Sequence, residues 1–235
     1  MNFAVAYRSI GNSRMKLYFY ENADWRMGTA LIGDIENGNY SQFESDGTLL
    51  FNGNATVWKD INMGAAQIIV PSAGNPGIDE LKDSAGDDTG VETLAFALNE
   101  HVSGIFEMQH DYKQGSDFIP HIHWQGITAP GGGTDNVKWQ MDYTVARNGS
   151  TIAPVTTIYI QSAFTTQYAM IRSDFTTIDG STAGIGSSNV LIGDQFCFKL
   201  TRIAASADDY AGDALMVTAG IHYEIDTVGS RTIEK

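Results

Sequence analysis

Two histidines separated by one residue have the clearest chemical potential in this sequence. His121 and His123 flank Ile122. Residues two positions apart in a β-strand point to the same face, so both imidazoles can reach one ion. Neutral imidazole is a ligand for Zn²⁺, Fe²⁺ and Ni²⁺. Two ligands are too few for a stable site, so a metal would need a third donor from His110, from a carboxylate or from symmetry-related copies.

The same pair has two other interpretations. In the first and simpler interpretation, the histidines form hydrogen bonds to neighbouring strands or lie in a subunit interface. A His-x-His strand also begins the metal site of cupin-like enzymes, which is completed by a carboxylate and a more distant histidine. The residues that follow Trp124 offer no carboxylate, although His222 is available as the distant histidine. A cupin-like, metal-dependent enzyme is therefore an alternative, but we expect no catalytic residues and no enzymatic activity.

A second group of possible ligands is acidic. Asp83, Asp87 and Asp88 cluster around Gly86, and carboxylate oxygens at such spacing can hold Ca²⁺. The segment lacks the EF-hand pattern, notably its terminal glutamate. A solvated acidic loop is the simpler interpretation. We expect no bound cofactor, with a transition metal or Ca²⁺ as the alternatives.

Composition and charge narrow the classes of partner. The chain has 235 residues, 43% of them hydrophobic, with 25 glycines and 5 prolines, which favours a folded protein of short strands joined by turns. The net charge is −14, and no basic stripe is visible, so we expect neither nucleic acid nor an anionic membrane as a partner. The first residues lack a basic leader followed by an apolar run, so we expect a protein that is made in a cytoplasm and stays soluble or joins an assembly.

Period-two alternation dominates the second half of the chain and predicts half-buried β-strands. In the clearest run, Trp139, Met141 and Tyr143 share an apolar face, and lysine, glutamine and aspartate occupy the other. In another, Leu215, Val217, Ala219, Ile221, Tyr223 and Ile225 are expected to face one way. Further strands are expected at residues 104–109, 119–125, 155–162 and 196–201. The fold class that follows is all-β, an antiparallel jelly-roll-like β-sandwich.

The first 60 residues show less alternation and several turn pairs, such as Asn37-Gly38 and Asp46-Gly47. We therefore expect an N-terminal arm or attachment region at 1–60 and a β-sandwich domain at 61–235. Helical periodicity is scarce, and its best candidate, residues 91–98, reads equally well as a strand.

Three segments resemble structural proteins of tailed-bacteriophage virions. The first is DGTLLFNGNATVWKD at residues 46–60, the second is HDYKQGSDFIPHIHW at 110–124, and the third is IHYEIDTVGSR at 221–231. With the strands between them, these segments span most of the chain from Asp46 onward. The resemblance implies a β-rich protein of the virion that is made in the host cytoplasm and forms symmetric oligomers, and it favours a homotrimer. It supplies no catalytic residues.

Two roles are open within this class. One is a capsid decoration or head-fibre component, whose partners are copies of itself and other virion proteins such as the major capsid protein. The other is a tail-fibre or receptor-binding subunit that contacts sugars on the host surface. The chain is short and lacks long fibrous repeats, which favours decoration.

Overall fold

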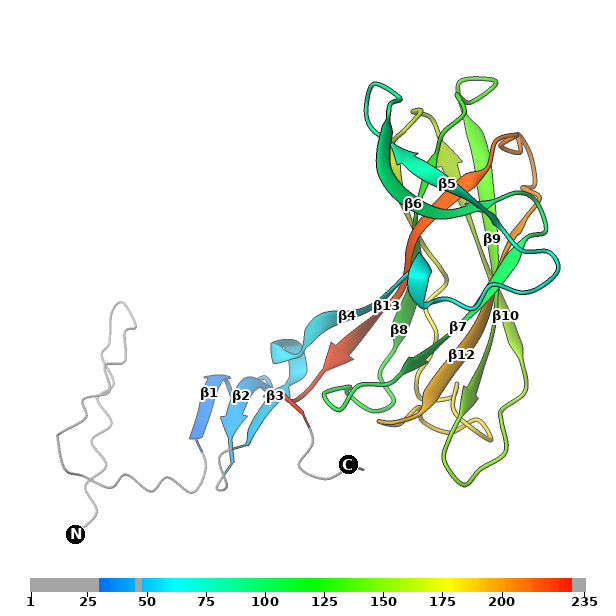
Figure 1. The fold of residues 1–235 in the computed structure, drawn as a ribbon. Helices are drawn as coiled ribbons and strands as arrows, with labels where there is room; N and C mark the ends of the chain where they lie inside the picture. Colours follow the sequence, from blue (N-terminus) through cyan, green and yellow to red (C-terminus); the bar gives the residue numbers. More distant parts are fainter. Residues whose placement is uncertain (1–29, 45–47, 230–235) are drawn as a thin grey trace, which may run out of the picture.

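The structure is a computed structural model that describes residues 30–44 and 48–229. Nearly all regular elements in this part of the chain are β-strands, and every strand pairing is antiparallel (Figure 1). Two packed sheets form an antiparallel jelly-roll-like β-sandwich, which confirms the predicted fold class. No helix among the described residues is long and apolar enough to cross a membrane.

One sheet of the sandwich has four strands in the order β10-β9-β12-β7. Its members are β7 (His101–Glu107), β9 (Asp135–Ala146), β10 (Thr156–Phe164) and β12 (Gln195–Ile203). Burial alternates at every residue of β9, because one face of this strand lies on the core and the other faces solvent. Trp139, Met141 and Tyr143 face the core, as their spacing predicts.

The other sheet has the strand order β11-β8-β13-β6-β5. Its members are β5 (Gly77–Lys82), β6 (Asp88–Phe96), β8 (Phe118–Gly126), β11 (Met170–Asp174) and β13 (Ala214–Ile225). The segment at 91–98, whose periodicity left helix and strand open, forms most of β6. A further strand, β4 (Val57–Gly64), pairs with the second half of β13, from Thr218 to Ile225.

Aromatic side chains from both sheets meet in the core. Trp124 of β8 lies edge-on to Trp139 of β9, with ring centroids 6.5 Å apart. Phe118 meets Phe196 of β12 in a T-shaped contact at 5.5 Å. Such edge-to-face pairs add to the free energy of apolar burial. The face of the six-stranded sheet that carries Trp124 is therefore its inner face, and the opposite side is called the outer face below.

The predicted alternation along β13 is correct for its second half and wrong for its first. Ala219, Ile221, Tyr223 and Ile225 face the core, but before them the core residues are Ala214 and Met216 rather than Leu215 and Val217. The pairing with β8 shifts register between Met216 and Thr218. A β-bulge inserts one extra residue there, and side chains on either side of it therefore change their parity.

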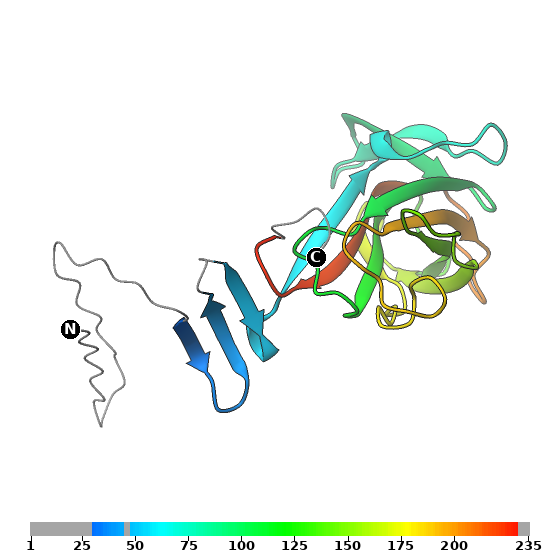
Figure 2. The same cartoon turned by 90° about the horizontal axis from the view of Figure 1, so that it is seen from below.

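A smaller sheet of three strands stands apart from the sandwich in both views (Figures 1 and 2). It contains β1 (Ala30–Asp34), β2 (Asn39–Phe43) and β3 (Leu49–Asn52), and a 3-10 turn at Gly53–Ala55 leads into β4. A second 3-10 turn, Ala65–Gln67, follows β4. The backbone N–H of Phe51 donates a 2.7 Å hydrogen bond to the carbonyl of Asp226, and this contact ties the sheet to the chain beyond β13.

The predicted boundary between arm and sandwich at residue 60 falls inside β4. Residues 57–60 already pair with β13, so they belong to the sandwich sheet rather than to the outlying one. The division into an attachment arm and a sandwich domain stays a prediction. Within the predicted arm, residues 1–29 and 45–47 lie outside the described part of the chain.

Candidate functional site

His121 and His123 lie on the outer face of β8, and Ile122 and Trp124 lie on its inner face, as the alternation predicts. The two imidazoles meet edge to face, with ring centroids 5.2 Å apart. His121 is fully buried, although it points away from the sandwich core, whereas His123 is partly exposed. Other side chains on the outer face must therefore cover His121.

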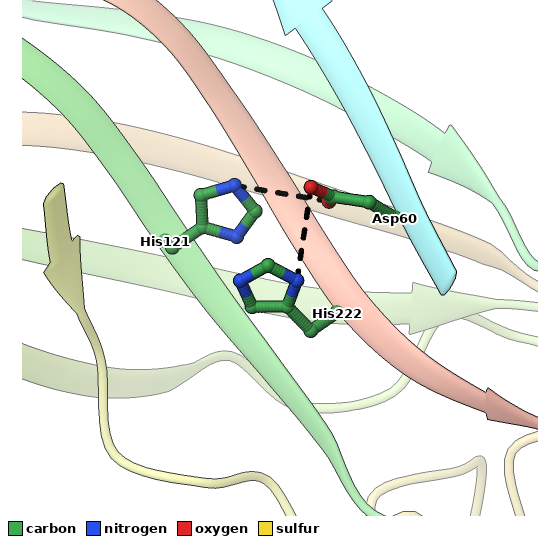
Figure 3. A group of neighbouring side chains, drawn as sticks. All are labelled: Asp60, His121 and His222. Carbon is green, nitrogen blue, oxygen red and sulfur yellow. Dashed lines mark ion pairs between the residues drawn. The ribbon is translucent and has the colours of Figure 1, made fainter. Parts of the chain in front are cut away.

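Strand register brings two further residues to His121. On β13, Gly220 lies directly opposite His121, and His222 lies two residues further along the same face. On β4, Asp60 lies directly opposite His222. Three neighbouring strands in the order β8-β13-β4 thus carry His121, His222 and Asp60 side by side on the outer face (Figure 3).

The absence of a side chain at Gly220 lets His121 lean across β13. A Cβ atom at Gly220 would lie 2.6 Å from Cε1 and 2.7 Å from Nε2 of His121, closer than any real contact of that kind. The His121 ring fills this space and stacks on the His222 ring, with centroids 4.1 Å apart and planes 15° apart.

Asp60 reaches both imidazoles. Its Oδ1 lies 3.7 Å from Nε2 of His121, and its Oδ2 lies 3.7 Å from Nδ1 of His222 (Figure 3). One ligand atom from each of the three residues falls within 4.8 Å of the others. Both separations exceed hydrogen-bond length, so the three groups face one another without bonding directly.

Burial shapes the electrostatics of the cluster. Burial and the neighbouring His222 lower the pKa of His121 to about 4, against the opposing effect of the Asp60 carboxylate. Burial and the nearby Arg172 also lower the pKa of His123. Both imidazoles are therefore held in their neutral form, in which a ring nitrogen carries a free lone pair.

Neither ring nitrogen of His121 has a hydrogen-bond partner, although both are buried. On the β11 side, Asp174 lies opposite His121 and Arg172 lies opposite His123. Asp174 accepts a 2.9 Å hydrogen bond from Arg172 through Oδ2, whereas its buried Oδ1 has no partner. Buried polar atoms without partners are uncommon in folded proteins, so their gathering here marks the cluster as unusual.

The three converging residues differ in part from those that the spacing suggested. His121 belongs to the cluster, whereas His123 lies beside it, outside the group whose ligand atoms converge. The sequence suggests His222 only as the distant histidine of a cupin-like site. The sequence does not indicate Asp60 as a ligand, because no pattern links it to residues 61 and 162 positions away. Two imidazoles and a carboxylate are a donor set for Zn²⁺ or Fe²⁺.

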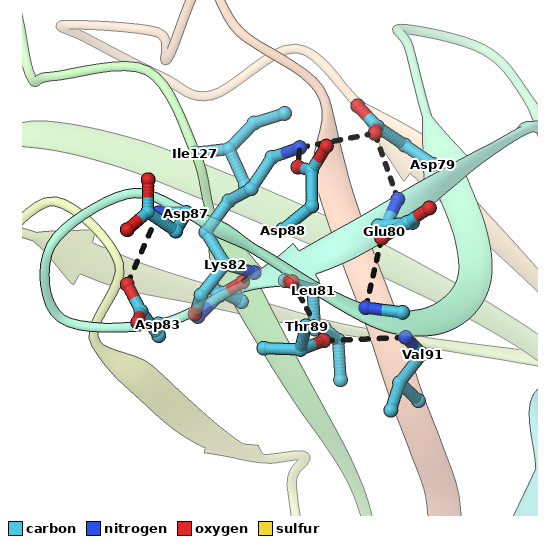
Figure 4. Close-up of polar contacts among 12 residues, drawn as sticks. Asp79, Glu80, Leu81, Lys82, Asp83, Asp87, Asp88, Thr89, Val91 and Ile127 are labelled. Carbon is cyan, nitrogen blue, oxygen red and sulfur yellow. Dashed lines mark hydrogen bonds and ion pairs between the residues drawn. The ribbon is translucent and has the colours of Figure 1, made fainter.

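The acidic segment after β5 is organised by its own hydrogen bonds (Figure 4). Asp83 Oδ1 accepts hydrogen bonds from the backbone N–H groups of Ala85 and Asp87, at 2.8 and 3.0 Å. Asp88 forms an ion pair with Lys82, which also lies 3.5 Å from Asp79. These contacts fit a solvated turn between β5 and β6, and the Ca²⁺ alternative stays untested.

A shallow hollow lies on the outer face next to the cluster. Trp58, Ile119 and Glu224 line it, and each is two residues along its strand from Asp60, His121 or His222. Lys113 and Asp117 complete its polar rim, and its volume is about 500 Å³. Lys113 forms a 2.8 Å ion pair with Glu224. The indole of Trp58 is 51% exposed, so an apolar ring with a polar handle borders the hollow.

Comparisons with known proteins give likeness of fold alone. No protein-family model and no curated protein matches the chain. Among solved structures, a Clostridium thermocellum xylanase 10B fragment, CBM22-1–GH10, matches with 4% identity and a TM-score of 0.37, over 70% of this chain and 28% of that one. TmCBM61 bound to β-1,4-galactotriose matches with 10% identity and a TM-score of 0.27, over 72% and 88%. The stem and receptor-binding domain of spike protein P1 from bacteriophage PM2 matches with 8% identity and a TM-score of 0.27, over 72% and 96%.

Proposed function

We propose that this chain is a non-enzymatic structural protein of a phage virion, a capsid decoration or head-fibre component that forms symmetric oligomers. Copies of the chain and the major capsid protein would be its partners. The observation that carries the proposal is the outlying sheet β1-β2-β3, which is attached to the sandwich but has no buried residue among its described strands. A sheet of this size needs a packed face to be stable, so a partner surface is the natural cover.

Both faces of the outlying sheet carry apolar side chains, and Leu31, Tyr40 and Leu50 share one of them. Pairing places Ile32, Phe43, Leu49 and Phe51 on the other face. Phe51 packs against the edge of the sandwich core, whereas Ile32 is 60% exposed and Phe43 is 44% exposed. Burying such side chains contributes about 1.5–3 kcal/mol each. A sheet that leaves this much apolar surface in water fits an attachment surface in an assembly.

The test compares charge substitutions on the two faces of this sheet. Ile32→Lys and Phe43→Lys place a charge on the face with the more exposed apolar side chains, and Gln42→Lys places one on the opposite face of the same sheet. Virions assembled with only the variant chain are purified, and the chain is quantified in them. The proposal expects the first two variants to fold but to be missing from virions, and Gln42→Lys to be incorporated. Equal incorporation of all three would contradict it.

A second candidate function is favoured by the hollow beside Trp58. A receptor-binding subunit that contacts host sugars needs an exposed aromatic ring for the apolar face of a sugar and polar groups for its hydroxyls. Trp58 supplies the first, and Lys113, Asp117 and Glu224 supply the second. The acidic rim suits neutral or cationic sugars better than anionic ones, because like charges repel.

A glycan array probed with the full-length chain and with Trp58→Ala tests this second candidate. Val57 is an equally exposed apolar neighbour whose side chain points to the other side of β4, so Val57→Ala is the matched control. Binding to a defined glycan that is lost only in Trp58→Ala would favour the receptor-binding role. Absence of binding would leave decoration as the better proposal. In a separate activity assay, turnover of a substrate that stops when a chelator is added would favour the cupin-like enzyme instead.

A further inference from the structure

We propose that Asp60, His121 and His222 bind one divalent transition-metal ion of the Zn²⁺ class within a single chain. The three side chains come from adjacent strands, and their ligand atoms lie within 4.8 Å of one another. Two imidazole nitrogens and one carboxylate oxygen match the donor types of Zn²⁺ sites. This proposal concerns a site of the sandwich and is independent of the role of the chain in a virion.

The unpaired nitrogens of His121 are the strongest support. The ring is fully buried, and neither Nδ1 nor Nε2 has a hydrogen-bond partner. Leaving a buried polar group unpaired costs about 1–3 kcal/mol. The closest acceptor on β4, Oδ1 of Asp60, is 3.7 Å from Nε2. An ion between Nε2 of His121 and Oδ1 of Asp60 would satisfy both of these atoms. If the position only had to be filled, an apolar ring would occupy the same volume without an unpaired polar group.

The local backbone is built to admit the His121 ring. Gly220 sits directly opposite His121, and any side chain there would collide with the imidazole and with Oδ1 of Asn62, which lies 2.6 Å from the position of a Cβ. The space above Gly220 on β13 is therefore reserved for the ring. This arrangement directs Nε2 of His121 across β13 toward Asp60 on β4.

Metal binding needs a short shift of the Asp60 carboxylate and a rotation of the His222 ring. With metal–ligand bonds of about 2.0–2.2 Å, tetrahedral ligand atoms lie roughly 3.3–3.5 Å apart. The two Asp60 separations are 3.7 Å, so the carboxylate has little distance to close. The lone pairs of stacked imidazoles lie in parallel planes, so the His222 ring must turn out of the stack. His222 and Asp60 can move because both side chains are partly exposed.

The ion would fasten an edge strand to the sheet. In the described part of the chain, β4 pairs only with β13, and it leads directly from the outlying sheet into the sandwich. An ion held by β4, β13 and β8 would tie the edge strand to two inner strands. Binding to the folded state alone stabilises it by mass action, so the protection should be strongest at β4.

The experiment uses the full-length chain, purified without a histidine tag and stripped with EDTA. Isothermal titration with Zn²⁺ near neutral pH measures stoichiometry and affinity, and hydrogen exchange with and without Zn²⁺ measures protection of residues 57–64. Asp60→Asn and His222→Gln remove single ligands from partly exposed positions, where the fold tolerates change better than at buried His121. His123→Gln is the matched control, because His123 is an adjacent histidine outside the converging group.

We expect one Zn²⁺ per chain, slower exchange along β4, and at least about a tenfold loss of affinity in both Asp60→Asn and His222→Gln. His123→Gln should bind as the parent does. A folded parent that binds no Zn²⁺ would overturn the proposal, as would affinities unchanged by Asp60→Asn and His222→Gln. A stoichiometry of one ion per three chains that is abolished by His123→Gln would replace it with a site between subunits.

Discussion

The imidazole rings of His121 and His222 lie face to face, with centroids 4.1 Å apart and planes 15° apart. The two residues are about a hundred positions apart in the chain and come from neighbouring strands. They are not directly opposite in the β8–β13 pairing, so the stack depends on the open position at Gly220, which lies directly opposite His121. The geometry of the cluster is therefore sensitive to changes at a residue that bears no functional group.

Gly220→Ala is expected to destabilise the fold. The new Cβ would lie 2.6 Å from both the His121 ring and Oδ1 of Asn62, and overpacking of this kind costs about 1–3 kcal/mol. Urea denaturation followed by circular dichroism measures the loss. Gly64→Ala is the control, because a Cβ at Gly64 on β4 meets nothing within 4 Å. A second substitution, His121→Ala, should recover part of the loss in the Gly220→Ala chain, since the two residues are in contact.

The buried imidazole of His121 should make stability depend on pH. Burial and the nearby His222 lower the pKa of His121 from 6.5 in the unfolded chain to about 4 in the folded one. Between these two values the unfolded chain holds the extra proton, so the stability contribution is complete above 6.5 and is lost as the pH falls towards 4. The melting temperature of the EDTA-treated chain, measured across this window, should fall on acidification.

His121→Gln is the variant that isolates this effect. Asp60, Asp174, His123 and His222 face the position from β4, β11, β8 and β13, and all four are present in both proteins. The parent should lose more of its melting temperature between pH 6.5 and pH 4 than the variant does. Parallel curves for the two proteins would show that His121 is protonated as easily in the fold as in the unfolded chain.

Arg202 is a buried cation whose loss should weaken the sandwich. Its guanidinium donates hydrogen bonds to the backbone carbonyls of Phe96, Tyr210 and Gly212, and the side chain is almost fully buried. Arg202→Met would leave three carbonyls without this donor, at a cost of about 3 kcal/mol or more. Lys199→Met, on the solvent side of the same strand, should change stability by about 1 kcal/mol or less. Chemical denaturation of both variants checks the difference.

The bulge in β13 should tolerate substitution far better than deletion. Val217 lies within the register shift and outside the core cluster, so Val217→Ala should have a small effect. Deleting Val217 would remove the extra residue and turn either the Met216 side or the Ala219 side of the strand away from the core. The deletion should cost at least about 2 kcal/mol more than Val217→Ala in urea denaturation. Equal effects would mean that the strand re-forms the bulge elsewhere.

Local patterns in the sequence were sufficient for most of the fold. The period-two alternation of Trp139, Met141 and Tyr143 specifies which face of β9 is buried, because successive side chains of a strand point to opposite sides. The same rule places His121 and His123 on one face of β8. Which segments form strands, and which of their side chains face the core, depends on residues that are close in the sequence. Both can therefore be predicted from a single sequence.

The alternation failed where the backbone departed from regular geometry. Leu215 and Val217 continue the apolar pattern of β13 without interruption, yet the bulge between Met216 and Thr218 moves the first part of the strand out of phase. A bulge adds one residue without leaving a distinct signature among apolar side chains. The pairing of residues 57–60 with β13 has no local signature either, because it joins segments about 165 positions apart.

The sequence by itself determined that two histidines share a face of a strand and that their apolar neighbours point inward. Only the tertiary structure decided which residues complete the cluster. Asp60, Gly220 and His222 meet His121 through the order β8-β13-β4 and the register of two strand pairings, and neither can be read from spacing along the chain. Register is set by the packing of the whole sheet on its core, so the residues that meet His121 are determined by the assembled sheet and not by local sequence.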